Sequence, residues 1–319
     1  MIFKKILIFI IFLAISFLVF FNVDKPIISP KLENTIKSKT GFIIFPSQEV
    51  KKTVTFALIG DLGLGRYITT ISRNKKDFSW VFQNVTSVLK SNDFNLANLE
   101  SPIINNCPEG KTGTFTFCGD TNFLPYLKEN KFIFNLANNH IFNYGQDGFN
   151  QTKDYLNKNQ ITYFYSHDSD TEFVKKEING ISFGFLGYDF ITNPNLDSNK
   201  IINAVKKYNQ EVDWLIVSLH WGNEYLKNPE SWRINLAHQL IDSGADIIHG
   251  HHPHVLQSIE IYKNKPIYYS LGNFVFDQSW SKETSSSELY ILKVDKENIL
   301  ESIKKPYLIK QNSQPQFLN

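Results

Sequence analysis

Six short apolar runs, rich in β-branched and aromatic residues, each end in polar residues or glycine, and this pattern constrains the fold more than any other feature. The runs are residues 53–59, 94–99 (interrupted by Asn95 and Asn98), 131–137, 214–219, 246–248 and 266–271. Short runs of this kind, bounded by turn residues, are typical of buried β-strands. The sequence therefore predicts an α/β fold in which these runs are strands.

Side chains with metal-binding or acid–base chemistry follow the ends of these runs. They are Asp61, Glu100, Asn139, His140, His220 and the histidines of residues 249–254. In layered α/β proteins, residues just beyond strand ends converge in space. Taken singly, each has an ordinary interpretation as a turn aspartate, a helix-capping asparagine or a partly buried histidine. Because the placement repeats along the chain, a shared site is the better hypothesis.

Histidines are concentrated in one part of the chain. Six of the eight lie between His220 and His254, and four of them lie within residues 249–254. Neutral imidazoles are the commonest protein ligands of metals, and the turn His252-Pro253-His254 suits two rings aimed at one point. A histidine-rich surface loop or a hydrogen-bonded turn is the alternative. Together with the carboxylates at other strand ends, this segment predicts a metal site.

Six motifs in this sequence resemble those of the CapA, or poly-γ-glutamate capsule synthesis, family of the calcineurin-like metallophosphatase superfamily. In the family's order they are Gly60-Asp61-Leu62-Gly63-Leu64-Gly65-Arg66, Asn98-Leu99-Glu100-Ser101-Pro102, Ala137-Asn138-Asn139-His140, His220-Trp221-Gly222, His252-Pro253-His254-Val255 and Ser270-Leu271-Gly272-Asn273-Phe274. The resemblance covers residues 53–277. It implies a four-layer α/β/β/α sandwich with a dinuclear metal site at one edge.

The resemblance also implies a role for each residue of the site. The implied metal ligands are Asp61, Glu100, Asn139, His220, His252 and His254. Asp61 and His254 would bind the first metal, and Glu100 would bridge the two metals, so the other three would bind the second. His140 matches a histidine that assists the leaving group. Arg66 would hold a substrate phosphate or carboxylate, with a surface salt bridge as the alternative.

The first motif departs from the wider superfamily, where a histidine usually follows the aspartate by two residues. Here Gly63 stands at that place, and the bridging aspartate is replaced by the longer Glu100. One bound metal rather than two therefore remains an alternative. Imidazole, carboxylate and amide ligands suit Mn, Fe or Zn better than Ca.

Gly60, Gly63 and Gly65 follow the first predicted strand. Their spacing is neither a dinucleotide-binding fingerprint nor a P-loop, so nucleotide cofactor binding is not expected. We expect these glycines to let the backbone turn sharply beside Asp61.

The N-terminus predicts a membrane attachment. After Lys4 and Lys5, residues 6–21 are apolar except for Ser16. We expect residues 1–23 to be an uncleaved signal anchor, residues 24–52 an extracytoplasmic linker, and residues 53–319 one domain outside the cell membrane. A cleaved signal peptide is the alternative, although no small-residue cleavage site follows the run.

Cys107 and Cys118 are the two cysteines of the chain, and they bracket a turn-rich stretch. An oxidising compartment would allow them to form a disulfide, while two unpaired thiols are the alternative. Closing so short a loop contributes about 3 kcal/mol in the chain-entropy model.

The charge balance and the resemblance together bound the function. With 33 basic and 31 acidic residues, a net charge of +2 argues against a nucleic-acid surface. We expect a metal-dependent hydrolase that acts on an anionic polymer such as poly-γ-glutamate. The alternatives are a non-catalytic structural or export component that works with other proteins of a capsule complex, and an envelope phosphoesterase.

Overall fold

The computed structural model describes residues 51–110, 115–166, 172–310 and 313–318. The predicted signal anchor, residues 1–23, and nearly all of the predicted linker lie outside these residues. Lys51–Asn319 form one compact unit. Within the described part of the chain, no helix combines the length and the apolar character that a membrane crossing requires.

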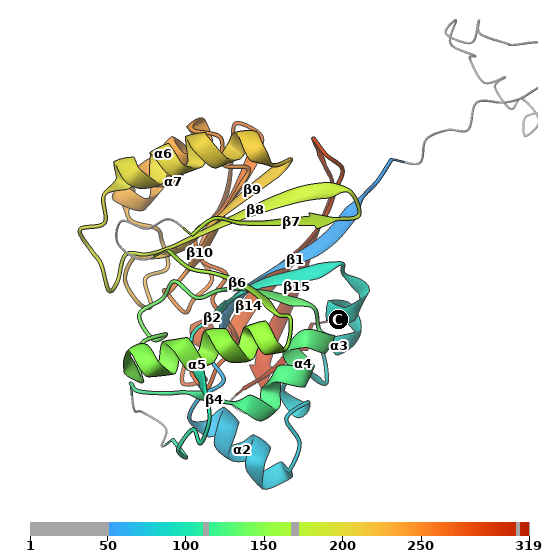
Figure 1. Ribbon diagram of the computed structural model, residues 1–319, viewed down its shortest axis with the longest axis vertical. Helices are drawn as coiled ribbons and strands as arrows, with labels where there is room; N and C mark the ends of the chain where they lie inside the picture. Colours follow the sequence, from blue (N-terminus) through green and yellow to red (C-terminus); the bar gives the residue numbers. More distant parts are fainter. Residues whose placement is uncertain (1–50, 111–114, 167–171, 311–312, 319) are drawn as a thin grey trace, which may run out of the picture. The chain divides into compact units, whose positions relative to one another are not determined.

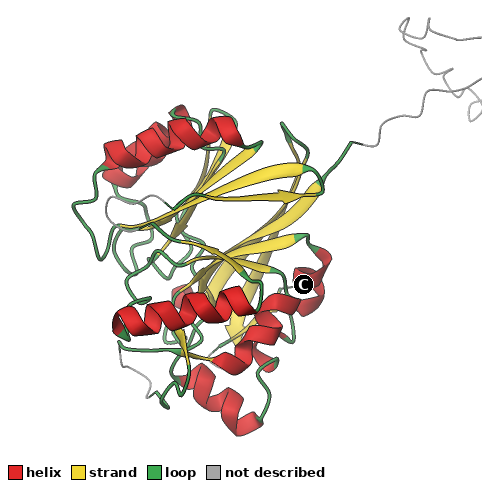
Figure 2. Ribbon diagram, in the orientation of Figure 1, coloured by secondary structure: helices red, strands yellow, loops and turns green. Residues whose placement is uncertain are grey.

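Two β-sheets lie face to face at the centre of this unit, and helices cover both outer faces (Figures 1 and 2). The larger sheet has the order β16-β15-β14-β1-β2-β5-β6, with β13 paired to β1. Its strands are β1 (Val54–Leu62), β2 (Phe94–Leu99), β5 (Phe132–Asn135), β6 (Thr162–Phe164), β13 (Asn273–Val275), β14 (Ser286–Val294), β15 (Ile299–Lys310) and β16 (Gln314–Phe317). Strands β1, β2, β5, β6 and β13 run parallel, whereas β14 to β16 pair antiparallel.

The smaller sheet has the order β11-β12-β10-β9-β8-β7. Its strands are β7 (Val174–Ile178), β8 (Ile181–Asp189), β9 (Trp214–His220), β10 (Ile247–His251), β11 (Ile259–Tyr262) and β12 (Lys265–Tyr268). The four central strands are parallel, and β7 and β11 form antiparallel edges. A separate two-stranded ribbon joins β3 (Ile103–Ile104) to β4 (Gly119–Asp120).

Helices complete the four layers. The larger sheet is covered by α2 (Tyr67–Lys75), α3 (Thr86–Ser91), α4 (Leu124–Glu129) and α5 (Gly145–Lys158), and the smaller sheet by α6 (Ser198–Tyr208) and α7 (Ser231–Asp242). A short α8 (Lys282–Ser285) and 3-10 turns at Trp80–Phe82, Thr121–Phe123 and Asn209–Glu211 complete the elements. In α5 the buried residues Phe149, Thr152 and Leu156 recur at helical spacing, so one face of this helix packs against the sheet.

Three apolar cores hold the layers together, one between each pair of neighbouring layers. The core between the two sheets is rich in aromatic residues. Phe56 of β1 stacks on Phe94 of β2 with ring centroids 4.7 Å apart, and it meets Phe183 of β8 edge-on at 5.6 Å. Each buried phenylalanine contributes roughly 1.5–3 kcal/mol, so this core fixes the two sheets against each other. The predicted four-layer α/β/β/α sandwich is confirmed.

All six predicted strands are present, but the structure contains strands that the apolar runs did not indicate. The hairpin of β7 and β8 and the antiparallel strands β14 to β16 were not expected. Much of β15 is exposed, with buried positions only near its end. A strand that faces solvent along most of its length lacks the continuous apolar run of a buried parallel strand.

Candidate metal centre

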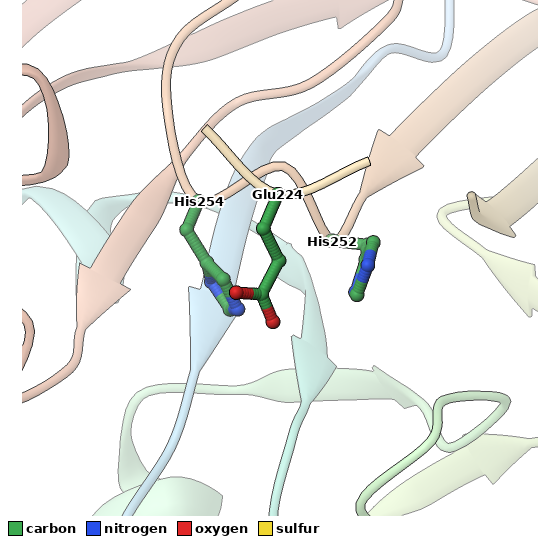
Figure 3. A group of neighbouring side chains, drawn as sticks. All are labelled: Glu224, His252 and His254. Carbon is green, nitrogen blue, oxygen red and sulfur yellow. The ribbon is translucent and has the colours of Figure 1, made fainter. Parts of the chain in front are cut away.

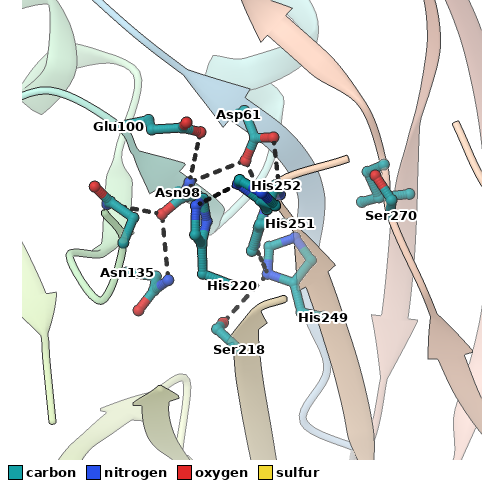
Figure 4. A network of polar contacts seen from close by, with 12 residues as sticks. Asp61, Asn98, Glu100, Asn135, Ser218, His220, His249, His251, His252 and Ser270 are labelled. Carbon is teal, nitrogen blue, oxygen red and sulfur yellow. Dashed lines mark hydrogen bonds and ion pairs between the residues drawn. The ribbon is translucent and has the colours of Figure 1, made fainter. Parts of the chain in front are cut away.

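The carboxyl ends of parallel strands from both sheets meet at one edge of the sandwich. Asp61 lies one residue before the end of β1, Glu100 follows β2, and Asn139 follows β5. In the smaller sheet, His220 ends β9 and His252 follows β10. Figure 4 shows four of these side chains in a single polar network. The structure thus brings together residues that are far apart in the sequence.

Asn98 of β2 holds the two carboxylates of the larger sheet. Its Nδ2 donates to Asp61 Oδ1 at 2.9 Å and to Glu100 Oε2 at 3.1 Å. Its Oδ1 accepts from the Nδ2 atoms of Asn135 at 3.2 Å and Asn138 at 3.1 Å. All five side chains are buried, so these hydrogen bonds fix the orientation of both carboxylates.

The turn after β10 presents two histidines in an uncommon backbone conformation. The φ angles of His252 and His254 are 93° and 57°, values that non-glycine residues rarely adopt and that cluster at functional sites. His254 Nδ1 lies 2.9 Å from Asn273 Oδ1. Because that amide oxygen accepts the Nδ1 proton, His254 Nε2 carries a lone pair, and it lies 3.5 Å from Glu100 Oε1.

Three donor atoms meet across the two sheets at the predicted second metal position. His220 Nε2 lies 2.8 Å from Asn139 Oδ1 and 3.2 Å from His252 Nδ1. Such separations fit neighbouring ligands around one ion with bonds of about 2.0–2.2 Å. At the predicted first position, the lone pair on His254 Nε2 faces Glu100 Oε1 at 3.5 Å, and the Nδ1 edge of the same ring lies 3.4 Å from Asp61 Oδ2.

Glu100 provides the test of whether a metal fits. Its side chain is completely buried, and Oε1 accepts no hydrogen bond within the described part of the chain. A buried carboxylate oxygen without a partner is costly, and a cation would satisfy it. Candidate ligand atoms of Asp61, Glu100 and His220 lie within 4.8 Å of one another, as do those of Glu224, His252 and His254. The residues present therefore fit a divalent metal.

Burial and charge set the protonation states of the site. Burial first, and then the charge of Asp61, raises the pKa of Glu100 well above its usual range. Burial would also raise the pKa of Asp61, but hydrogen bonds and charges from His251 and His254 hold it well below its usual value. Burial lowers the pKa of His252 to about 3. A neutral imidazole offers the lone pair that a metal ion requires.

His140 lies beside the centre. Its Nε2 is 4.0 Å from Glu100 Oε1, and its Nδ1 lies 3.2 Å from Asn143 Oδ1. Burial lowers the pKa of His140 to about 4, against the opposing effect of the hydrogen bond to Asn143. With the Nδ1 proton donated to Asn143, the Nε2 lone pair is directed toward the carboxylate side of the site.

Arg66 is buried and forms an ion pair with Asp277. Its guanidinium also lies over the rings of Phe117, at 4.7 Å, and Phe276, at 5.7 Å. The salt bridge weighed as the alternative for Arg66 is therefore present, although it is buried rather than on the surface. The substrate-binding role stays a prediction.

The structure explains how the first motif accommodates Gly63. A Cβ atom at this position would come within 2.8 Å of the ring of Phe276, so an apolar ring occupies the space that a side chain would need. The expectation of a sharp turn beside Asp61 was wrong, because β1 continues through Leu62. Gly60 instead allows close approach of the Gly272 carbonyl oxygen.

The sequence assigned no individual role to several contributors to the network. Asn98 looked like an interruption of a strand, although a polar residue inside a buried run was the signal for it. His251 Nδ1 lies 3.1 Å from Asp61 Oδ1, and His251 Nε2 lies 3.2 Å from His249 Nδ1. His249 in turn lies 2.9 Å from the carbonyl oxygen of Ile59, so these two histidines support Asp61 from behind.

The predicted disulfide between Cys107 and Cys118 is confirmed, with the two Cα atoms 5.8 Å apart. It holds the segment that carries Phe117, whose backbone N–H donates to Asn143 Oδ1 at 3.0 Å. The ring of Phe117 lies against His140 with centroids 4.1 Å apart. The cross-link therefore anchors one wall of the site.

Much of this chain is similar in sequence to known proteins. Residues 55–278 match the family described as "Bacterial capsule synthesis protein PGA_cap". The chain is 30% identical over 257 residues to "Capsule biosynthesis protein CapA" of Bacillus anthracis, a match that covers 73% of this chain and 62% of that protein. It is 31% identical over 250 residues to "PGA biosynthesis protein CapA" of Bacillus subtilis, covering 72% of this chain and 65% of that protein. The chain thus spans less than two thirds of the length of both relatives.

A solved structure of a putative 5'-nucleotidase from Staphylococcus aureus, in complex with alpha-ketoglutarate, aligns with 83% of this chain and 54% of that chain, at 14% identity and a TM-score of 0.48. The four layers and the histidine, carboxylate and amide groups at one edge define an α/β/β/α sandwich protein with a candidate metal centre. The chain belongs to the bacterial capsule synthesis protein family PGA_cap.

Proposed function

We propose that this protein is a metal-dependent hydrolase of capsule synthesis that acts on an anionic polymer such as poly-γ-glutamate. The observation that carries the proposal is the buried, unpartnered Oε1 of Glu100 among aligned oxygen and nitrogen donors. The names of the relatives support the substrate class, since one is called a PGA biosynthesis protein.

The ligands are proposed to be Asp61, Glu100, Asn139, His220, His252 and His254. A bound divalent ion, with Mn, Fe or Zn the candidates, would supply the Lewis acidity that polarises a scissile bond and activates water. Asn98 holds Asp61, and Asn273 holds His254, in fixed orientations. The ligands therefore need not reorient when the reaction occurs.

His140 would transfer the proton. Its Nε2 lone pair is directed toward the site because Nδ1 is held by Asn143. In the hydrolysis, Nε2 would accept a proton from water and return it to the leaving nitrogen or oxygen. Arg66 would bind a carboxylate of the polymer through its planar guanidinium, whose N–H groups match the two oxygens of a carboxylate.

The test is metal analysis of the full-length chain, prepared without a histidine tag, together with assays on poly-γ-glutamate and on generic phosphoesters. We expect turnover of the polymer to fall about 10²–10⁴-fold in His140→Ala while metal content is retained. His238→Ala is the matched control, because the His238 ring stacks on Tyr262 and hydrogen-bonds to Glu260, and none of these residues belongs to the metal centre. Bound metal without turnover of any substrate would instead favour a structural or export component, and cleavage of phosphoesters alone would favour a phosphoesterase.

We also propose that the domain is held outside the cell membrane by residues 1–23. The apolar run of residues 6–21 supports an anchor. The disulfide supports an oxidising compartment. Protease added to intact protoplasts should remove the domain and leave a small membrane-bound fragment, whereas full protection would place the domain inside.

A further inference from the structure

Glu224 lies beside the metal centre but is not among the ligands that the sequence predicted. It follows β9 in the loop that leads to α7, and its side chain is exposed. One of its carboxylate oxygens lies within 4.8 Å of ring nitrogens of both His252 and His254. Figure 3 shows the carboxylate next to the ring of His254, with His252 on its other side.

The loop that carries Glu224 is tied to the histidine turn. The backbone N–H of Trp221 donates to the His251 carbonyl oxygen at 3.2 Å, and that of Tyr225 donates to the Pro253 carbonyl oxygen at 2.9 Å. Glu224 lies between these two hydrogen bonds. Its position over the centre is therefore set by the backbone rather than by a flexible side chain alone.

The base of the loop is also fixed. Gly222 has a φ angle of 83°, and the guanidinium of Arg233 lies so close to it that a Cβ atom at this position would clash. Arg233 is completely buried, stacks over Trp221 at 4.9 Å and donates to the Trp221 carbonyl oxygen at 3.3 Å. Because the turn at Gly222 is fixed in this way, residues 223–225 lie beside the histidine turn, where Tyr225 bonds the Pro253 carbonyl oxygen.

The metal position near His254 needs another donor. Gly63 has no side chain to supply one, and the ring of Phe276 fills the space beside it. The predicted ligands there are Asp61, Glu100 and His254, and the exposed carboxylate of Glu224 lies within 4.8 Å of a ring nitrogen of His254. We propose that Glu224 is a metal ligand that closes this position in place of the side chain that Gly63 lacks.

This inference rests on the proposed metal centre. It adds a chemical preference, since three carboxylates and one imidazole form a set richer in oxygen than a site with two imidazoles. Oxygen-rich sets favour Mn²⁺ over the softer ions.

The experiment is a titration of the full-length chain with Mn²⁺, with free Mn²⁺ measured by electron paramagnetic resonance. We expect Glu224→Gln to bind at least one ion tenfold or more weakly than the unsubstituted chain. Glu283→Gln is the matched control, because that exposed carboxylate pairs with Lys227 at 3.0 Å, and it should bind as the unsubstituted chain does.

Equal binding by Glu224→Gln and the unsubstituted chain would overturn the role of Glu224 and leave the metal centre standing. Failure of the unsubstituted chain to bind Mn²⁺, Fe²⁺ or Zn²⁺ would overturn both proposals. Because Glu224 is exposed, the substitution should leave the unfolding midpoint of the metal-free chain unchanged, so a folding defect is distinguished from the loss of a ligand.

Discussion

The two sheets contribute different chemistry to the same edge of the sandwich. The larger sheet supplies oxygen donors from Asp61, Glu100 and Asn139, whereas the smaller sheet supplies nitrogen donors from His220 and the turn after β10. The carboxylates of Asp61 and Glu100 accept hydrogen bonds from the amide of Asn98, whereas His252 and His254 lie in a backbone turn with positive φ angles. Neither sheet alone has a complete set of ligands, so the centre depends on the aromatic core that fixes the two sheets together.

The largest expected effect comes from removing one donor on either side of this comparison. Glu100→Gln removes the shared charge, and His220→Ala removes a nitrogen donor. We expect each to weaken metal binding by more than about 100-fold, the upper range for residues that only orient ligands. Metal analysis after dialysis measures the loss, with Glu129→Gln as a surface control. Full retention of metal in His220→Ala would show that His220 is not a required ligand.

The disulfide supports the part of the site that the larger sheet forms, because it holds Phe117 against His140. We expect the double substitution Cys107→Ser/Cys118→Ser to lower the free energy of unfolding by about 3 kcal/mol, because the unfolded chain gains the entropy of an open loop. Urea unfolding measures this loss, and the unsubstituted chain in reductant should behave like the variant. A loss below about 1 kcal/mol would contradict the chain-entropy account.

Asn98 should matter more for metal binding than for the stability of the fold. Asn98→Ala removes the donor to both carboxylates, and we expect about 10–100-fold weaker metal binding. Asn95 is a matched control on the same strand, since its Nδ2 donates to the carbonyl oxygens of Leu89 at 2.9 Å and Asn130 at 2.6 Å. Asn95→Ala should destabilise the fold and leave the metal affinity of the folded protein unchanged. Equal losses of affinity would show that any buried asparagine of β2 supports the centre.

The smallest effect is expected at Asp295, which lies at the ends of the strands farthest from the metal centre. Its backbone carbonyl oxygen accepts a hydrogen bond from Trp214 Nε1 of the smaller sheet at 2.7 Å. The backbone N–H of Glu297, then Lys51 and the N–H of Asn298, lower the pKa of Asp295 to about 2. The stability that this carboxylate contributes is therefore present above pH 3.8 and is lost as the pH falls toward 2. Thermal unfolding between pH 5 and 2 should show a steeper loss in the unsubstituted chain than in Asp295→Asn. Parallel curves would contradict the assignment.

Local sequence predicted much of the molecule. Continuous apolar runs indicated the buried strands, because a parallel strand covered on both faces needs apolar residues throughout. The polar residues at the ends of these runs marked Asp61, Glu100 and Asn139 as members of one site. The disulfide was also predictable, since its two cysteines are close in the sequence and a short loop closes easily.

What the sequence determined by itself was the set of strands, their polar ends and the family motifs, because these depend on local periodicity and spacing. Only the tertiary structure decided that Phe276 fills the space beside Gly63, that Asn98 joins two carboxylates, and that Glu224 reaches the histidine turn. Each of these interactions joins residues from different strands or loops. Their distances are set by the packing of two sheets and by backbone hydrogen bonds between loops, which no local pattern of residues specifies.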